Sequence, residues 1–357
     1  MHARIFLCII ALVLAAPIAA RAEEAIAPDI GVRVVRDYVS PTLRAFSQTS
    51  GRLKGTLDDL CRDPSPSALE AARIAFAETV GNWGHVSVLR FGPLAEGNRF
   101  ERVFFWPDPR GVTLRQVQGL LGSKDALPAD IAAESVALQG LPALDYVLFG
   151  TGAEKLGAAG GDERRCRYGA AVAGNVAGIA EALIGAWGEG TAFHAAFTAP
   201  AADRDPYRSV GEVAAEIVKA AGTALQFTRN AELLPALGDA PQKANGRRAP
   251  FWRSRQSFAF AAAQLDGVKQ LVEAAGFVEG PSDTVNGYGR GVVFDVGHAR
   301  DALLAVAGKP EEAFAEEEDR ARIAYAAVAM EGAKHMLNGE LSGALGLVMG
   351  FNALDGD

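Results

Sequence analysis

The chain has 357 residues, 49% of them hydrophobic, and a formal net charge of −8. A chain of this length is too long for one small hydrophobic core and, at about 150 residues per domain, indicates two domains. The acidic balance gives the protein no electrostatic reason to bind nucleic acid or anionic lipid, so we expect neither as a partner.

The first 22 residues predict a signal peptide. His2 and Arg4 precede an apolar stretch over residues 5–16, and Ala20-Arg21-Ala22 has the small-residue pattern of a cleavage site. A transmembrane anchor is the alternative, but the stretch is shorter than the ~20 residues of a spanning helix. We therefore expect residues 1–22 to be removed on export to the periplasm, which leaves no membrane span in the mature chain.

Two cysteines remain after this processing, Cys61 and Cys166. An oxidising compartment permits them to pair, and closing a loop of about a hundred residues stabilises a fold by several kcal/mol in the chain-entropy model. Two free buried thiols are the alternative. We expect the disulfide.

Helical periodicity runs along nearly the whole chain, while the alternation typical of strands is scarce, so we predict an all-α protein. The segment Ser67-Ala68-Leu69-Glu70 has the pattern of a capping box and predicts the start of a helix. This helix is expected to run to about Phe91, where Gly92-Pro93 would stop it. Trp83 and Arg90 would then share its apolar face.

A second helix is predicted over residues 131–149, with Pro142 in its interior, where proline would kink it. The alternative is that Gly140-Leu141-Pro142 separates two helices. Asp145 falls on the apolar face, with leucines three and four residues away. Because an isolated charge is too costly to bury, Asp145 must be paired, hydrogen-bonded or protonated. It is therefore a site candidate.

Glycine and alanine dominate residues 151–162, which predicts a loop, and a glycine- and proline-rich stretch near residues 188–206 marks a boundary. We accordingly expect an N-terminal half over residues 23–200 and a C-terminal half over residues 201–357. Further helices are expected at residues 168–187, 207–226, 257–275, 298–307 and 318–338.

A proline-bracketed turn presents Trp106, Asp108 and Arg110. Such a rigid turn can line a cleft. The alternative is that Asp108 and Arg110 tie down a loop while Trp106 fills the core.

Arg253 and Arg255 lie just before Ser257, at the start of the helix expected over residues 257–275. Their charge opposes the helix dipole and needs a partner, which Asp145 from the other half could supply. A solvated first turn is the alternative, and it suits Arg253 better than Arg255.

Patterns typical of known catalytic and metal centres are missing from the sequence. There is no nucleophile elbow, nucleotide-binding glycine loop or H-E-x-x-H. His298 with Asp301, and Glu331 with His335, could each place two ligands on one helical face, but each pair lacks a third ligand. We expect these residues to have surface or capping roles, and we predict no catalytic residue and no metal ligand.

Several motifs in one order resemble the imelysin-like proteins, also called insulin-cleaving membrane peptidases. They are NWGHVSVLRFGP, RVFFWPDPRGVTLRQVQGLL, SVALQGLPALDYVLFG, APFWRSRQSFAF and the terminal LGLVMGFNALDGD. The resemblance implies an exported, all-helical protein of two bundle-like halves, with a site in the cleft where they meet. It also implies an association with periplasmic iron uptake.

The family's hallmark, G-x-H-x-x-E, maps onto residues 140–145 of this chain. Gly140 is kept, Pro142 stands where the histidine belongs, and Asp145 replaces the glutamate. Proline offers no ligand atom and aspartate is one methylene shorter, so a metal held by an H-x-x-E pair cannot be assembled here.

We therefore expect a non-catalytic binding or accessory protein with a link to iron or metal acquisition and no required cofactor. Its partner would be a small ligand, a metal such as iron, or an envelope protein. The first alternative is a metallopeptidase that uses His85, His298 or His335 with Asp145. The second is a structural envelope protein that binds through an apolar surface. The candidate cleft residues are Asp145, Gly140, Gln139, Arg90, Trp83, Trp106, Asp108, Arg110, Arg253, Arg255 and Ser257.

Overall fold

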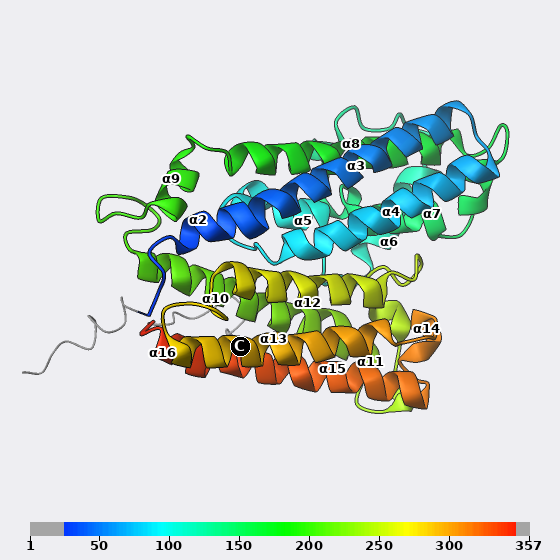
Figure 1. Ribbon diagram of the computed structural model, residues 1–357. Helices are drawn as coiled ribbons and strands as arrows, with labels where there is room; N and C mark the ends of the chain where they lie inside the picture. The colour runs from blue at the N-terminus through cyan, green and yellow to red at the C-terminus, as the bar shows by residue number, and fades with distance from the viewer. Residues whose placement is uncertain (1–24, 348–357) are drawn as a thin grey trace, which may run out of the picture.

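The computed structural model describes residues 25–347, and throughout this range the regular elements are helices. The signal peptide expected over residues 1–22 and most of the terminal motif LGLVMGFNALDGD lie outside the described residues. Two groups of long helices pack against each other (Figure 1).

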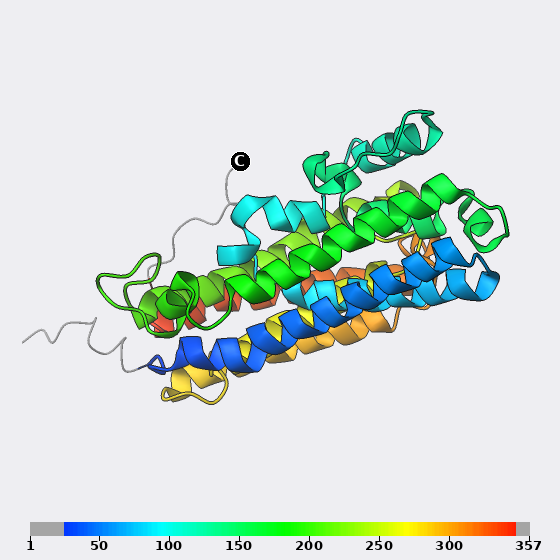
Figure 2. The same cartoon turned by 90° about the horizontal axis from the view of Figure 1, so that it is seen from above.

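The first group contains α3 (Ser40–Arg62), α4 (Pro66–Ser87) and α8 (Glu163–Ala186), with the shorter α7 (Leu141–Phe149) against α8. The second group contains α10 (Val210–Phe227), α12 (Ser257–Ala274), α13 (Asp283–Leu304) and α15 (Glu317–Met336). Figure 2 shows the long helices running roughly along one direction. The prediction of an all-α fold is confirmed.

The remaining elements are short. The α-helices are α2 (Ile30–Val34), α5 (Arg99–Val103), α6 (Val112–Gly122), α9 (Ala192–Thr198), α11 (Leu234–Leu237), α14 (Pro310–Ala313) and α16 (Ser342–Ala344). Three π-helical segments, η1 (Val35–Val39), η7 (Thr228–Leu233) and η10 (Leu337–Leu341), join consecutive helices, and 3-10 turns occupy several loops.

Helix α12 lies directly on α4 and so joins the two groups. Gly84 of α4 permits this approach, because a Cβ at that position would lie 2.7 Å from the Cβ of Ala263. Real Cβ atoms essentially never come so close. A larger side chain at position 84 would therefore force the two groups apart.

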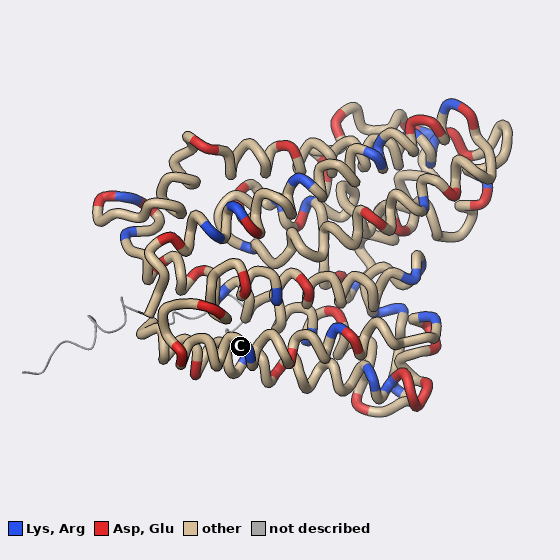
Figure 3. The backbone as a smooth tube through the Cα atoms, in the orientation of Figure 1, with Lys and Arg blue, Asp and Glu red and all other residues tan. Residues whose placement is uncertain are grey.

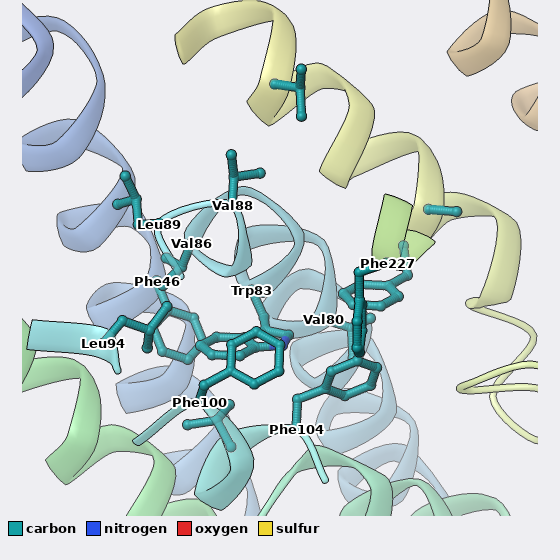
Figure 4. Packing of buried hydrophobic residues seen from close by; sticks show 14 of the residues in the cluster. Phe46, Val80, Trp83, Val86, Val88, Leu89, Leu94, Phe100, Phe104 and Phe227 are labelled. Carbon is teal, nitrogen blue, oxygen red and sulfur yellow. The ribbon is translucent and has the colours of Figure 1, made fainter. Parts of the chain in front are cut away.

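Aromatic rings continue the core from one group to the other. Ring centroids are 5.4 Å apart for Phe46 and Trp83, 5.6 Å for Trp83 and Phe100, and 5.9 Å for Phe100 and Phe227 (Figure 4). Burial of such rings is a large apolar contribution to stability. Because the buried residues form one cluster, both groups share a core, and the domain division at residue 200 stays a prediction.

The start of α4 corrects one sequence prediction. Ser65, not Ser67, caps the helix: its Oγ accepts a hydrogen bond from the Ala68 amide at 3.2 Å, and Pro66 occupies the first helical position. Proline suits that position because its missing amide hydrogen would have no partner there. The helix also ends at Ser87, before the expected Phe91.

The predicted kinked helix over residues 131–149 is wrong, and the alternative is right. Two 3-10 turns lead to Gly140, after which α7 begins, so Pro142 lies in its first turn and breaks no helical hydrogen bond. Gly140 is needed because a Cβ would lie 2.3 Å from the carbonyl oxygen of Val103.

Two further helices begin earlier than expected. Helix α8 begins at Glu163 instead of residue 168, and α13 extends N-terminally from the expected residues 298–307 to Asp283. Four glycines at positions 287, 289, 291 and 297 dilute the apolar periodicity of α13. At Gly289 the helix packs against the Phe277 backbone, which a Cβ would overlap.

The disulfide between Cys61 and Cys166 is present, with a Cα–Cα distance of 5.5 Å. It ties the end of α3 to the start of α8. Helix α8 has the length and apolar composition of a membrane span, but it packs along α3 and buries Tyr168, Val172 and Leu183. These are properties of a core helix.

Candidate functional site

Asp145 lies buried in α7, with only 2% of its surface exposed. Its Oδ1 accepts a hydrogen bond from the Ser254 amide at 3.1 Å, and its Oδ2 lies 3.8 Å from Nη1 of Arg253. Burial raises the pKa of the carboxyl to about 6, although Ser254 and Arg253 favour the charged form. The sequence expectation that Asp145 needs a partner, and that an arginine of the second half supplies it, is met by this geometry.

The segment that reaches Asp145 is the loop before α12. Phe251 and Arg255 both have positive φ, at 55° and 60°, which residues with a Cβ seldom adopt. A turn stabilised by the Gln256 amide donating to the Phe251 carbonyl at 3.0 Å holds this conformation. The loop thereby presents Arg253 and the Ser254 amide toward α7.

The guanidinium of Arg253 is packed among aromatic rings. Its Cζ lies 4.4 Å from the ring centroid of Trp252 and 5.5 Å from that of Tyr146. Burial lowers the pKa of Arg253, while Asp145 opposes this shift. Such stacking suits arginine, whose planar charge is weakly hydrated.

A cavity of about 410 Å³ opens beside this pair, within the range of small-molecule sites. It lies where the loop before α12 meets α6 and α7. We name it the Arg253 pocket; its lining includes Trp106, Gln118, Asp145, Tyr146, Thr151, Arg247, Trp252 and Arg253.

The proline-bracketed turn contributes Trp106 and Asp108 to the wall of the pocket. Both carboxylate oxygens of Asp108 accept amide hydrogens from the start of α6, from Val112 at 2.7 Å and Thr113 at 2.8 Å. Trp106 donates its Nε1 hydrogen to the Ala231 carbonyl at 2.9 Å and lines the pocket. Arg110 is exposed, so the loop-fixing role fits Asp108 and the cleft role fits Trp106.

Gln139 and Ser257 hold the backbone around the site. The Oε1 of Gln139 accepts from Arg102 at 2.8 Å, and its Nε2 donates to the carbonyls of Ala132 and Glu134. Ser257 donates to the Pro250 carbonyl at 2.6 Å. Both are buried, and neither lines the Arg253 pocket.

Arg90, Trp83 and Arg255 are placed elsewhere. Arg90 follows the end of α4. Its Cζ lies 3.9 Å from the ring centroid of Phe100 and its Nη2 lies 3.3 Å from Oε1 of Glu101, so it is not the partner of Asp145. Trp83 is fully buried in the aromatic core. Arg255 lines a different cavity of about 470 Å³ beside Arg73 and Phe149.

Sequence reasoning missed Arg247 and Tyr146 as pocket residues and gave no role to Trp252. The Cζ atom of Arg247 lies 5.4 Å from the ring centroid of Trp252, in the segment just before the Arg253 turn. Tyr146 directly follows Asp145, and its hydroxyl accepts a hydrogen bond from Gln118 at 3.1 Å. A signal was available in the adjacent aromatic and basic residues of this loop.

A second buried acid, Glu232, was also missed. It has no exposed surface, and its Oε1 accepts a hydrogen bond from Gln264 at 3.1 Å, while its Oε2 has no hydrogen-bond partner among the described residues. Burial raises its pKa to about 8, although Gln264 and the charge of Arg90 favour ionisation. It lies in the π-helical segment η7, where the register of the helix changes.

The residues at the Arg253 pocket do not fit a metal ion. Within residues 25–347, no group of three or more His, Cys, Asp or Glu side chains is close enough to hold one. Pro142 supplies no ligand atom, and the Arg253 charge beside Asp145 would repel a cation.

The histidines proposed as substitute ligands have other neighbours. His85 contacts Asp266 at 3.2 Å, His335 contacts Glu331 at 3.1 Å, and His298 packs against the Phe294 ring. The metallopeptidase alternative therefore lacks the ligand set that it requires in the described part of the chain.

We expect Arg253→Met to destabilise the protein by about 3 kcal/mol at pH 8, because it leaves the buried Asp145 carboxylate without its cation. The pKa of Asp145 is higher in the folded protein than its ordinary value of 3.8, so the protein loses stability as the pH rises from 3.8 toward the folded value. Removing Arg253 should raise the folded pKa further. The carboxyl of the variant is then mostly protonated at pH 5, and the destabilisation there should be smaller. Urea denaturation at both pH values measures the difference.

Arg255→Met is the matched control, since it removes an exposed arginine two residues away. Adding Asp145→Asn to Arg253→Met should recover most of the stability at pH 8. Equal destabilisation by Arg253→Met at pH 5 and pH 8 would show that the variant loses packing and not charge compensation.

Comparison with known proteins agrees with this architecture. The imelysin family, peptidase M75, matches residues 39–335. No curated protein matches the chain. An imelysin-like protein from Psychrobacter arcticum 273-4 superposes with a TM-score of 0.73 at 18% identity, covering 95% of this chain and 100% of its own. A "putative iron-regulated protein A precursor" from Parabacteroides distasonis ATCC 8503 superposes with a TM-score of 0.72 at 14% identity, covering 93% of this chain and 97% of its own. Because the family match spans most of its length, the chain belongs to the imelysin family.

Proposed function

We propose that this imelysin family member is an exported binding or accessory protein without peptidase activity, and that its ligand occupies the Arg253 pocket. The observation that carries the proposal is the environment of Asp145. One of its oxygens accepts a hydrogen bond from the Ser254 amide and the other lies near the Arg253 guanidinium. In this arrangement the carboxylate helps to hold the wall of the pocket, and its oxygens are not disposed as metal ligands.

Export is supported by the predicted signal peptide and by the Cys61–Cys166 disulfide, because disulfides persist in oxidising compartments. A role in iron acquisition is supported by the name of the Parabacteroides neighbour, which describes that protein as iron-regulated. In this chain the pocket would act on iron through a bound ligand, since its own residues do not suit the bare ion.

A protease assay tests the absence of peptidase activity. The mature protein should leave an unfolded protein substrate intact with added zinc, with added iron and with a chelator. A variant with the family motif restored, Pro142→His with Asp145→Glu, is the comparison for the same assay. Cleavage by the unaltered chain that a chelator abolishes and zinc restores would contradict the proposal.

One observation favours the envelope-interaction alternative as a second function. Phe294 of α13 and Tyr325 and Val328 of α15 expose 64%, 52% and 71% of their surfaces on two helices that pack together. Tyr325 and Val328 lie three residues apart on α15 and so share a face, and exposed apolar side chains on one face are typical of protein contacts. Replacing all three with serine should leave folding intact and abolish any envelope complex, and an unchanged complex would exclude this face.

A further inference from the structure

We propose that the Arg253 pocket takes a small organic anion in which a carboxylate is attached to a planar apolar group. The inference rests on the proposed binding function and specifies its ligand class. Two arginines without a hydrogen-bonded carboxylate, neighbouring acids that are already engaged, and an aromatic lining point to this class of ligand.

The Arg253 guanidinium has unused donors. Only 20% of its side chain is exposed, yet within residues 25–347 it makes no hydrogen bond, and the Asp145 contact at 3.8 Å is too long to be one. None of its nitrogens is among the fully buried side-chain atoms without a partner, so these donors are accessible from the pocket. A planar guanidinium pairs with a carboxylate through two parallel hydrogen bonds, so a ligand carboxylate can bind to them.

Arg247 adds a second positive charge to the same wall. It stacks over Trp252, and no carboxylate of the described chain pairs with it. Burial lowers the pKa of Arg253, and the charge of Arg247 contributes to the same shift, so the two cations repel each other. An anion bound between them would relieve that repulsion.

The acids that line the pocket cannot neutralise both arginines. Asp108 is engaged by two backbone amides at the start of α6. Asp145 accepts from the Ser254 amide and has one oxygen toward Arg253. Although charges of both signs are intermixed over the helices (Figure 3), the pocket lining thus favours an anion.

The aromatic residues define the rest of the ligand. Trp106, Tyr146 and Trp252 contribute ring surface to a cavity of about 410 Å³. A neighbouring cavity of about 710 Å³ shares Trp106 and Arg247 with the Arg253 pocket. Flat rings of this kind stack on planar apolar groups, whereas inorganic phosphate would use only the arginines.

Isothermal titration of the mature protein with 2-naphthoate, its neutral analogue 2-naphthamide and inorganic phosphate tests the ligand class. We expect saturable binding of 2-naphthoate, with at least about tenfold weaker binding of the other two, which corresponds to the loss of one charge-assisted hydrogen bond. Arg253→Lys keeps the charge that supports Asp145 but loses the planar fork, and should weaken 2-naphthoate binding about tenfold.

Arg247→Gln should also weaken binding of 2-naphthoate, and Arg248→Gln is its matched control because Arg248 lies outside the Arg253 pocket. Equal affinity for 2-naphthoate and 2-naphthamide, phosphate binding as tight as 2-naphthoate, or no binding of 2-naphthoate would each overturn the inference. Chelator-sensitive cleavage by the unaltered chain would instead overturn the proposed function, so the two failures are distinguishable.

Discussion

Glu232→Gln is expected to stabilise the protein at pH 8 by on the order of 4 kcal/mol and to leave its stability at pH 4 nearly unchanged. The pKa of Glu232 is about 8 in the folded protein and its ordinary value is 4.5. The folded state therefore holds a proton that the unfolded state releases, and each pKa unit corresponds to about 1.4 kcal/mol. Stability is lost as the pH rises from 4.5 to 8, and glutamine removes this loss.

The substitution keeps the acceptor that Gln264 uses, because the amide oxygen can replace Oε1. Guanidinium denaturation at several pH values measures the effect as the difference between variant and unaltered protein. Glu279→Gln removes the same charge at an exposed position and is the control. A constant difference between the two proteins from pH 4 to pH 8 would contradict a proton held by Glu232.

Replacing both Cys61 and Cys166 with alanine should destabilise the protein by about 4 kcal/mol. The disulfide joins residues 105 positions apart, and closing a loop of about this length restricts the unfolded chain strongly in the chain-entropy model. It also fixes α3 to α8 at the end of the first helical group. Thermal unfolding measures the loss as a lowered Tm.

Reduction of the unaltered protein should lower the Tm to the value of the double variant, while the double variant itself should not respond to reductant. If the unaltered and variant proteins unfolded at the same temperature without reductant, the disulfide would contribute nothing to the stability of the fold.

The burial of Asp145 and its need for a partner could be predicted from the local sequence pattern and from the general cost of burying a charge. Apolar neighbours at helical spacing bury the side chain, and a buried carboxylate needs a partner. The charge argument at the start of α12 applied to both Arg253 and Arg255 and favoured Arg255 as the paired residue. The structure instead pairs Arg253 with Asp145 and leaves Arg255 exposed.

Arg90 and Glu232 show where sequence reasoning fails. The chain leaves α4 after Ser87, so helical spacing no longer governs Arg90, which packs on Phe100. Glu232 lies in a π-helical segment whose wider turn does not follow the usual periodicity. Proline gives the same sequence signal at a helix kink and in a first helical turn, so the sequence alone leaves both positions of Pro142 open.

The central claim is that an arginine-supported carboxylate replaces the metal-ligand pair of the family motif in this chain. Elemental analysis of the mature protein, exported and purified without chelator and then incubated with zinc and iron, tests it most directly. The account predicts no metal above the buffer level, both in the unaltered protein and in Asp145→Asn. About one metal ion per chain in the unaltered protein that Asp145→Asn loses would contradict it.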